Sequence, residues 1–173
     1  MNGGSIRRLL DRLYDAAGAL AALALVALLL IILAQILTRW LDTPFPGGTE
    51  YAGYCMAAAS FLALAHTLRH AAHIRVELLA QHLPERARRL LEIVATAIAA
   101  GLGWYFAWFA ARGVRVSRMI GDISQGQDAT PLWIPQLVMA AGVLLLAVAL
   151  TDHLVSLARG GPGIIAGERP AES

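Results

Sequence analysis

Four long runs of apolar residues dominate the chain, and each is long enough to cross a bilayer as a helix. A hydrocarbon core about 30 Å thick is spanned by about 20 helical residues. The runs lie at about 16–37, 51–68, 91–111 and 132–152, and none has an acidic or basic residue near its centre. They predict an all-α integral membrane protein with four transmembrane helices, organised as a single membrane domain over 1–173.

Between the second and third runs lies a charged segment that still repeats apolar residues at helical spacing. The intervals are 4, 3 and 4, which places one set on a single helical face: Ala72, Val76, Leu79 and Leu83. We therefore expect an amphipathic helix at about 71–83 that lies in the membrane interface. The segment at 160–173 is rich in glycine and is expected to be a flexible tail.

The other two connectors differ in character. The segment at 42–50 contains two prolines and two glycines, so we expect a tight turn. Thr49 is a candidate cap for the second helix, and Glu50 falls in its first turn, where a carboxylate complements the helix dipole. An ion pair of Glu50 with Arg39 or with a partner subunit is the alternative. The segment from Gly113 to Thr130 is expected to form a short structured loop.

Composition narrows the function. The chain is 58% hydrophobic and 15% charged, with a mean hydropathy of +0.60, whereas a soluble domain carries roughly 25% charge. All 14 basic residues are arginines. Without lysine there is no Walker A loop and no pyridoxal Schiff base. The single cysteine, Cys55, excludes an intramolecular disulfide and any site built from several thiolates. We expect no enzyme activity.

The arginines also predict an orientation, because cytoplasmic segments retain positive charge. With the N-terminus inside, ten of the 14 arginines lie in cytoplasmic segments. The remaining four lie outside: Arg39, Arg112, Arg115 and Arg118. This asymmetry predicts that both termini face the cytoplasm.

Two features of the spans leave alternatives open. His66 and His153 lie near the inner ends of two different spans and could in principle ligate a haem, as in a membrane anchor of an oxidoreductase. The other interpretation of the histidines is hydrogen bonding at the interface. The third run carries a small residue at every fourth position, and this seam favours close packing on a neighbour in the same chain or on a partner: Ala95, Ala99, Gly103, Ala107 and Ala111.

Local motifs connect these features to a known family. Arg69 precedes His73-Ile-Arg75-Val-Glu77-Leu-Leu, which is similar to a pattern of a basic residue followed by His-Ile-x-Val-acidic-x-Leu. Glu50 opens the second span, and Thr130-Pro-Leu-Trp-Ile-Pro135 is followed by Ala141-Gly142 in the fourth. In this order the motifs resemble the small membrane subunit of tripartite ATP-independent periplasmic (TRAP) transporters, DctQ type.

The resemblance implies a scaffold role in the bacterial inner membrane. The large permease subunit of such a transporter carries the substrate, often coupled to Na⁺, and a periplasmic receptor delivers an organic acid. The small subunit braces the large one. Partners of the chain would be these two proteins and membrane lipid, with no nucleic acid. No cofactor is expected on this chain, and the coupling Na⁺ belongs to the large subunit.

Nine residues are candidates for partner contacts or for a structural motif. The three arginines of the second outer segment could dock the receptor or bind lipid phosphates. The full set is Glu50, Arg69, His73, Arg75, Glu77, Gly103, Arg112, Arg115 and Arg118.

Overall fold

The computed structural model describes residues 3–69 and 84–159, and within them the chain forms four helices and no extended strand. They are α1 (Gly3–Trp40), α2 (Gly48–Arg69), α4 (Glu85–Ile120) and α5 (Trp133–Ala158). Each of the four is long and apolar enough to cross a membrane. The prediction of an all-helical protein with four candidate spans is therefore confirmed. The expected interfacial helix at 71–83 and the tail at 160–173 lie outside the described residues.

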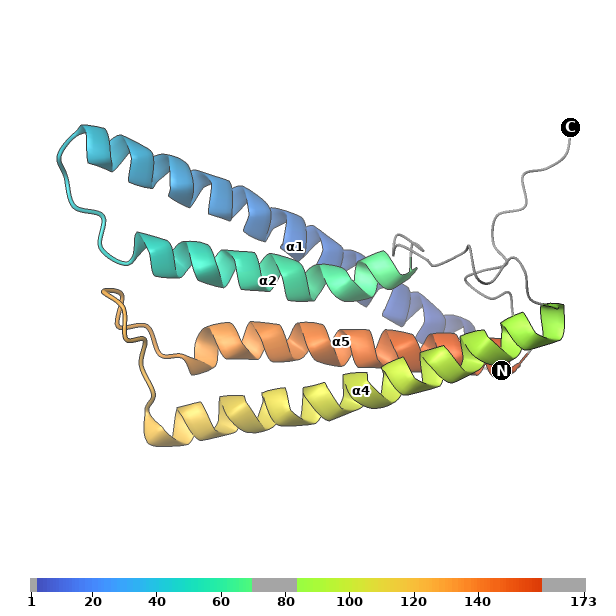
Figure 1. Cartoon of the computed structure of the whole chain (residues 1–173). Coiled ribbons are helices and arrows are strands. Elements are labelled where there is room, and N and C mark those ends of the chain that lie inside the picture. The colour runs from blue at the N-terminus through green and yellow to red at the C-terminus, as the bar shows by residue number, and fades with distance from the viewer. Residues whose placement is uncertain (1–2, 70–83, 160–173) are drawn as a thin grey trace, which may run out of the picture.

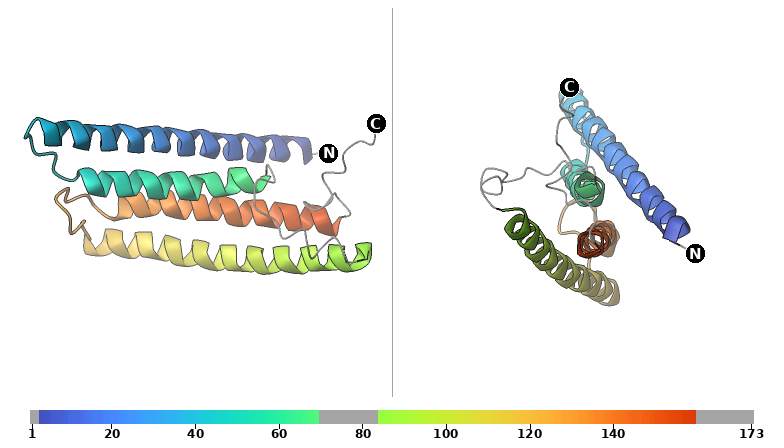
Figure 2. Two further views of the ribbon diagram at one scale, coloured as in Figure 1. Left: turned by 45° about the horizontal axis from the view of Figure 1, so that its top comes forward. Right: turned by 90° about the vertical axis from the view of Figure 1, so that its right-hand side faces the viewer.

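The helices stand in a row rather than in a closed bundle. Helix α1 packs on α2, α2 on α5, and α5 on α4, so that α1 and α4 form the two edges (Figure 1). Figure 2 shows this from the end, where α2 and α5 are viewed nearly along their axes and α1 and α4 lie obliquely. Because each edge helix packs extensively on one neighbour, many large apolar side chains remain exposed. Such an arrangement suits a bilayer, since lipid covers apolar surface at no cost.

The edge helices are much longer than a membrane requires. Helix α1 has 38 residues and α4 has 36, which correspond to about 57 and 54 Å. The hydrocarbon core is about 30 Å thick, and a helix that exceeds it adapts by tilting. The oblique course of both edge helices fits this expectation (Figure 2). The apolar runs at 16–37 and 91–111 thus lie within longer helices.

The core between the helices consists mainly of small residues. Tyr14, Ala65 and Ala149 form a buried cluster where α1, α2 and α5 meet. Helices α2 and α5 approach closely at Gly142, where a Cβ atom would lie 2.6 Å from the carbonyl carbon and oxygen of Phe61. Small side chains allow this proximity, and dispersion contacts between the backbones then stabilise the pair.

Two connectors meet at one end of the row, which we call the loop end. The 41–47 turn is tight, as predicted, and Gly47 adopts the left-handed conformation with φ 77°. The second connector is shorter than expected, because α4 continues to Ile120 and ends at Gly121 with φ 66°. The prediction of a loop beginning at Gly113 is wrong. A single glycine inside a helix costs only about 1 kcal/mol relative to alanine and does not terminate it.

Candidate functional site

The connector at 121–132 closes on itself at the loop end. The Leu132 amide donates a hydrogen bond to the Asp122 carbonyl at 3.0 Å, and the Ser124 amide donates to the Thr130 carbonyl at 2.8 Å. These bonds bring the two ends of the connector together, which is typical of a compact Ω-loop. The segment is therefore an ordered structure that joins α4 to α5.

The same connector is fixed to α2 by a side-chain hydrogen bond. The Tyr54 hydroxyl donates to Asp128 Oδ2 at 3.0 Å. Beside it, a Cβ atom on Gly47 would lie 2.8 Å from the Cβ of Asp128, so the two connectors pack closely. Sequence reasoning did not predict this contact, because the two residues are 74 positions apart and neither belongs to a periodic pattern.

The environment of Asp128 favours its ionised form. Desolvation raises the pKa of its carboxyl group, but hydrogen bonds from Thr130, Ser124 and Tyr54 together lower it more strongly. The resulting pKa is about 2, below the ordinary value of 3.8. Asp128 is therefore a carboxylate at physiological pH and an acceptor for the hydroxyl groups around it.

Glu50 lies in the first turn of α2, as the sequence predicts. The helix begins at Gly48, so Thr49 is inside the first turn and the prediction that it caps the helix is wrong. The carboxyl group of Glu50 lies against Gly126 of the second connector, so a larger residue at this position would require the Glu50 side chain to move. Glu50 thus complements the positive end of the helix and supports the connector above it.

The three candidate arginines are on the last turns of α4 rather than in a loop. Arg112, Arg115 and Arg118 are all exposed. The guanidinium carbon of Arg118 lies 5.6 Å from the centre of the Trp133 ring, at the start of α5. This distance is within the range of a cation–π interaction, which links the loop ends of α4 and α5.

The small-residue seam of α4 is only partly internal. A Cβ atom on Gly103 would lie 3.3 Å from the Cα of Ala147, so Gly103 packs directly on α5. Ala95 and Ala111 are exposed, because a row at spacing four drifts by about 40° per step around a helix of 3.6 residues per turn. On α2, Gly53 is exposed and a Cβ there would meet nothing within 4 Å.

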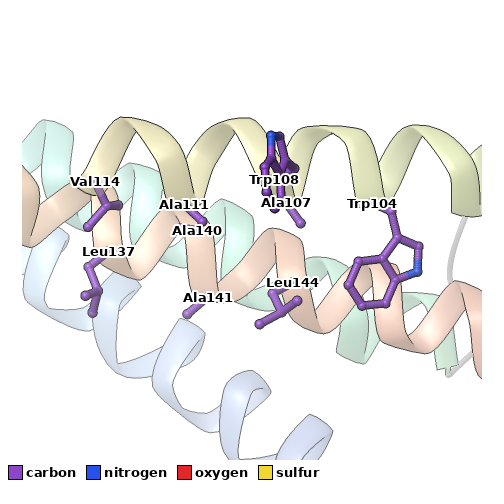
Figure 3. A pocket seen from close by; sticks show the side chains of 9 residues that line it. All are labelled: Trp104, Ala107, Trp108, Ala111, Val114, Leu137, Ala140, Ala141 and Leu144. Carbon is purple, nitrogen blue, oxygen red and sulfur yellow. The ribbon is translucent and has the colours of Figure 1, made fainter. Parts of the chain in front are cut away.

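An apolar groove runs between α4 and α5 beside this seam. It has a volume of about 610 Å³, and Trp104 marks one end of it while Val114 and Leu137 mark the other (Figure 3). Alanines from both helices lie between these ends. The Trp104 indole donates a hydrogen bond from Nε1 to Thr151 Oγ1 at 3.0 Å, which fixes this ring against α5.

Comparison with known proteins decides the family. The profile of the tripartite ATP-independent periplasmic transporters, DctQ component, matches residues 28–160. The chain belongs to this family. The match includes α2, α4 and α5 in full. No curated protein matches the chain. The DctQ component is a part of a transporter and not an enzyme, and a multi-pass membrane protein with four apolar helices fits that assignment.

The two described histidines of this DctQ-type subunit, His66 and His153, are directed to different helices. His66 Nδ1 lies 3.8 Å from Asp15 Oδ1 on α1, and His153 Nε2 lies 3.9 Å from Glu92 Oε1 on α4. From α2 and α5 the two imidazoles therefore turn toward opposite edges of the row. Haem ligation by the pair would need both rings to face one site. The geometry gives the haem alternative no support.

The motif that carried the resemblance lies largely beyond the described residues. Arg69 is the last residue of α2, and His73, Arg75 and Glu77 follow in the segment that the structure does not describe. Their role in this DctQ-type subunit stays a prediction.

Proposed function

We propose that this DctQ-type subunit is a scaffold that braces the large permease subunit of a TRAP transporter during uptake of an organic acid delivered by a periplasmic receptor. The observation that carries this proposal is the open row of helices. Helix α1 packs extensively only on α2, and its leucines are exposed along the apolar centre, with Leu23 at 64% and Leu30 at 59%. An edge of this kind offers a long apolar surface to another membrane protein.

Substrate transport and ion coupling belong to the large subunit in this proposal. A transport path needs ionisable groups or broken helices near the middle of the membrane. The centres of the four apolar runs contain no acidic or basic residue, and the described helices are continuous. The coupling ion, for which we propose Na⁺, would therefore bind outside this chain.

The proposed orientation places both termini in the cytoplasm and the protein in the bacterial inner membrane. The ten-to-four distribution of arginines supports it. Helix α1 begins and helix α5 ends at the same end of the row, which is opposite the loop end (Figure 1). The loop end would then face the periplasm, where the 121–132 connector is available to the receptor.

A tagged copy extracted from native membranes in mild detergent tests the proposal. We expect recovery in near equal amounts with a much larger polytopic membrane protein, and loss of receptor-dependent uptake when the gene is deleted. A photo-crosslinking residue at Leu30 or at Tyr105, which are exposed on opposite edges of the row, should label that partner from at least one edge. An untagged strain is the control for recovery.

Recovery of a lone homo-oligomer with a Soret band would overturn the scaffold function. That result would instead support haem ligation by His66 and His153. Uptake that persists without this chain would equally contradict a bracing role.

A further inference from the structure

The groove between α4 and α5 has the dimensions of a hydrocarbon chain. Its α4 wall extends from Trp104 to Val114, about 15 Å of helix, which equals half of the ~30 Å hydrocarbon core. The groove has a volume of about 610 Å³ and is lined by alanine, leucine, valine and tryptophan side chains. A flexible acyl chain can therefore lie along it and contact apolar groups over its whole length.

Two arginines stand in line with the groove at the loop end. Trp104 and Ala111 line the groove and are seven residues apart, which puts them on one side of α4. Arg115 and Arg118 follow Ala111 by four and by seven residues, so they lie on the same side of the helix, and both are exposed. Arg112 follows Ala111 directly and is therefore displaced by about 100° around the helix. Two of the three arginines thus share the side of the groove, and one does not.

The α5 side of the groove supports the same position for a charged group. Arg118 lies over the ring of Trp133, which precedes the groove-lining Leu137 by about one turn. A guanidinium group held on an aromatic face keeps its N–H donors available for an oxygen ligand. At the opposite end, the Trp104 indole is fixed to Thr151. The groove therefore has apolar walls, an indole at one end, and exposed arginines beyond the other end.

We propose that this groove binds one acyl chain of an anionic phospholipid, whose phosphate pairs with Arg115 and Arg118. Guanidinium groups bind phosphate oxygens through paired, charge-assisted hydrogen bonds. The lipid belongs to the leaflet at the loop end, because the arginines stand there and the groove reaches about halfway through the membrane. This site goes beyond the scaffold function and does not depend on it, since all the groups that form it belong to this chain.

Photoreactive lipid tests the site in the intact transporter complex. The complex is reconstituted into phosphatidylcholine vesicles that contain phosphatidylglycerol with a diazirine near the end of one acyl chain. After irradiation, labelled peptides are mapped by mass spectrometry. We expect label on 104–114 and 137–144, and stronger competition by unlabelled phosphatidylglycerol than by phosphatidylcholine.

Three variants identify the cause of labelling. Replacing Arg115 and Arg118 by glutamine, singly or together, should lower labelling of the groove by about fivefold for each arginine replaced. Arg112→Gln removes an equal charge from another side of the helix and should lower labelling clearly less, because this side chain does not form the paired hydrogen bonds to the phosphate. Ala141→Phe should block the groove while leaving the arginines in place. Thermal unfolding is used to verify that each variant is folded. If Ala141→Phe does not fold, the arginine variants alone test the proposal.

Several results would overturn the proposal. Label spread evenly over all exposed helix faces would show that lipid contacts the groove without binding there. An equal loss in Arg112→Gln would mean that overall charge, rather than this pair of arginines, attracts the lipid. Absence of label together with crosslinks from the groove to the large subunit would show that a protein partner fills it.

Discussion

The contact between α2 and α5 at Gly142 gives the sharpest test of how the row is held together. Substitution by alanine adds one methyl group, whose carbon would lie 2.6 Å from the carbonyl carbon and oxygen of Phe61. The collision is with backbone atoms, so no side-chain rotation can relieve it. The two helices must move apart, and contacts on both sides of the crossing weaken.

The expected cost follows from two opposing contributions. Forcing an extra methyl group into a packed core costs about 1–3 kcal/mol. Alanine also has a higher helix propensity than glycine, which returns up to about 1 kcal/mol. Gly142→Ala should therefore lower the free energy of unfolding by about 1–2 kcal/mol. In Gly53→Ala the new methyl group meets nothing within 4 Å, so this matched variant should be neutral or slightly stabilising.

Thermal unfolding of the purified chain in detergent measures the difference. The single thiol of Cys55, half-buried on α2, reacts with a fluorogenic maleimide as the packing of α2 is lost. We expect the unfolding midpoint of Gly142→Ala to fall by about 2–4 °C per kcal/mol, with that of Gly53→Ala unchanged or higher. Equal midpoints in the two variants would refute the close approach of α2 and α5.

Three further outcomes follow from named contacts. Gly103→Leu should weaken the α4–α5 contact by about 1–3 kcal/mol, because the new Cβ atom alone would lie 3.3 Å from the Cα of Ala147. An unchanged unfolding midpoint would contradict this prediction. Tyr54→Phe removes the donor to Asp128, so amide exchange in 121–132 should become several-fold faster by mass spectrometry. The pKa of Asp128 is depressed to about 2 from 3.8, so its contribution to loop stability is complete above pH 4 and is lost as the pH falls through 2. Protection of the 121–132 amides should therefore be constant from neutral pH to about 4, and a loss above pH 5 would exclude Asp128 as its cause.

The sequence predicted the helices well because length and polarity alone determine them. A run of about 20 apolar residues has few alternatives to a membrane helix, since every backbone polar group must be paired within it. The position of Glu50 followed from an equally local rule, the preference of a carboxylate for the start of a helix. Local rules were less exact at helix ends. They predicted a loop beginning at Gly113 and a helix cap at Thr49, but both residues lie inside helices.

Contacts between distant segments were beyond the sequence. The Tyr54–Asp128 hydrogen bond joins residues from α2 and the second connector, and no pattern in either segment indicates the other. The seam on α4 packs on α5 at Gly103, whereas the sequence left open whether its neighbour belongs to the same chain or to a partner. Its extent was overestimated, because a spacing of four does not stay on one side of a helix with 3.6 residues per turn. The groove also escaped notice, since it needs residues of two helices at once.

The open row explains why small residues pack the centre of this protein while large ones lie outside. Between helices in lipid there is no gain from hiding leucine, because the acyl chains are as apolar as the side chain. Close backbone approach does provide dispersion contacts, and the chain places Gly142 and Gly103 where α5 meets its two neighbours. The larger residues are then left to set the outer shape. On α1 they form a continuous apolar edge, whereas on α4 and α5 they frame an apolar groove, and exposed arginines follow it toward the loop end of α4. These two surfaces lie on different helices and differ in charge, so a protein partner and a lipid can bind the same subunit without competing for one place.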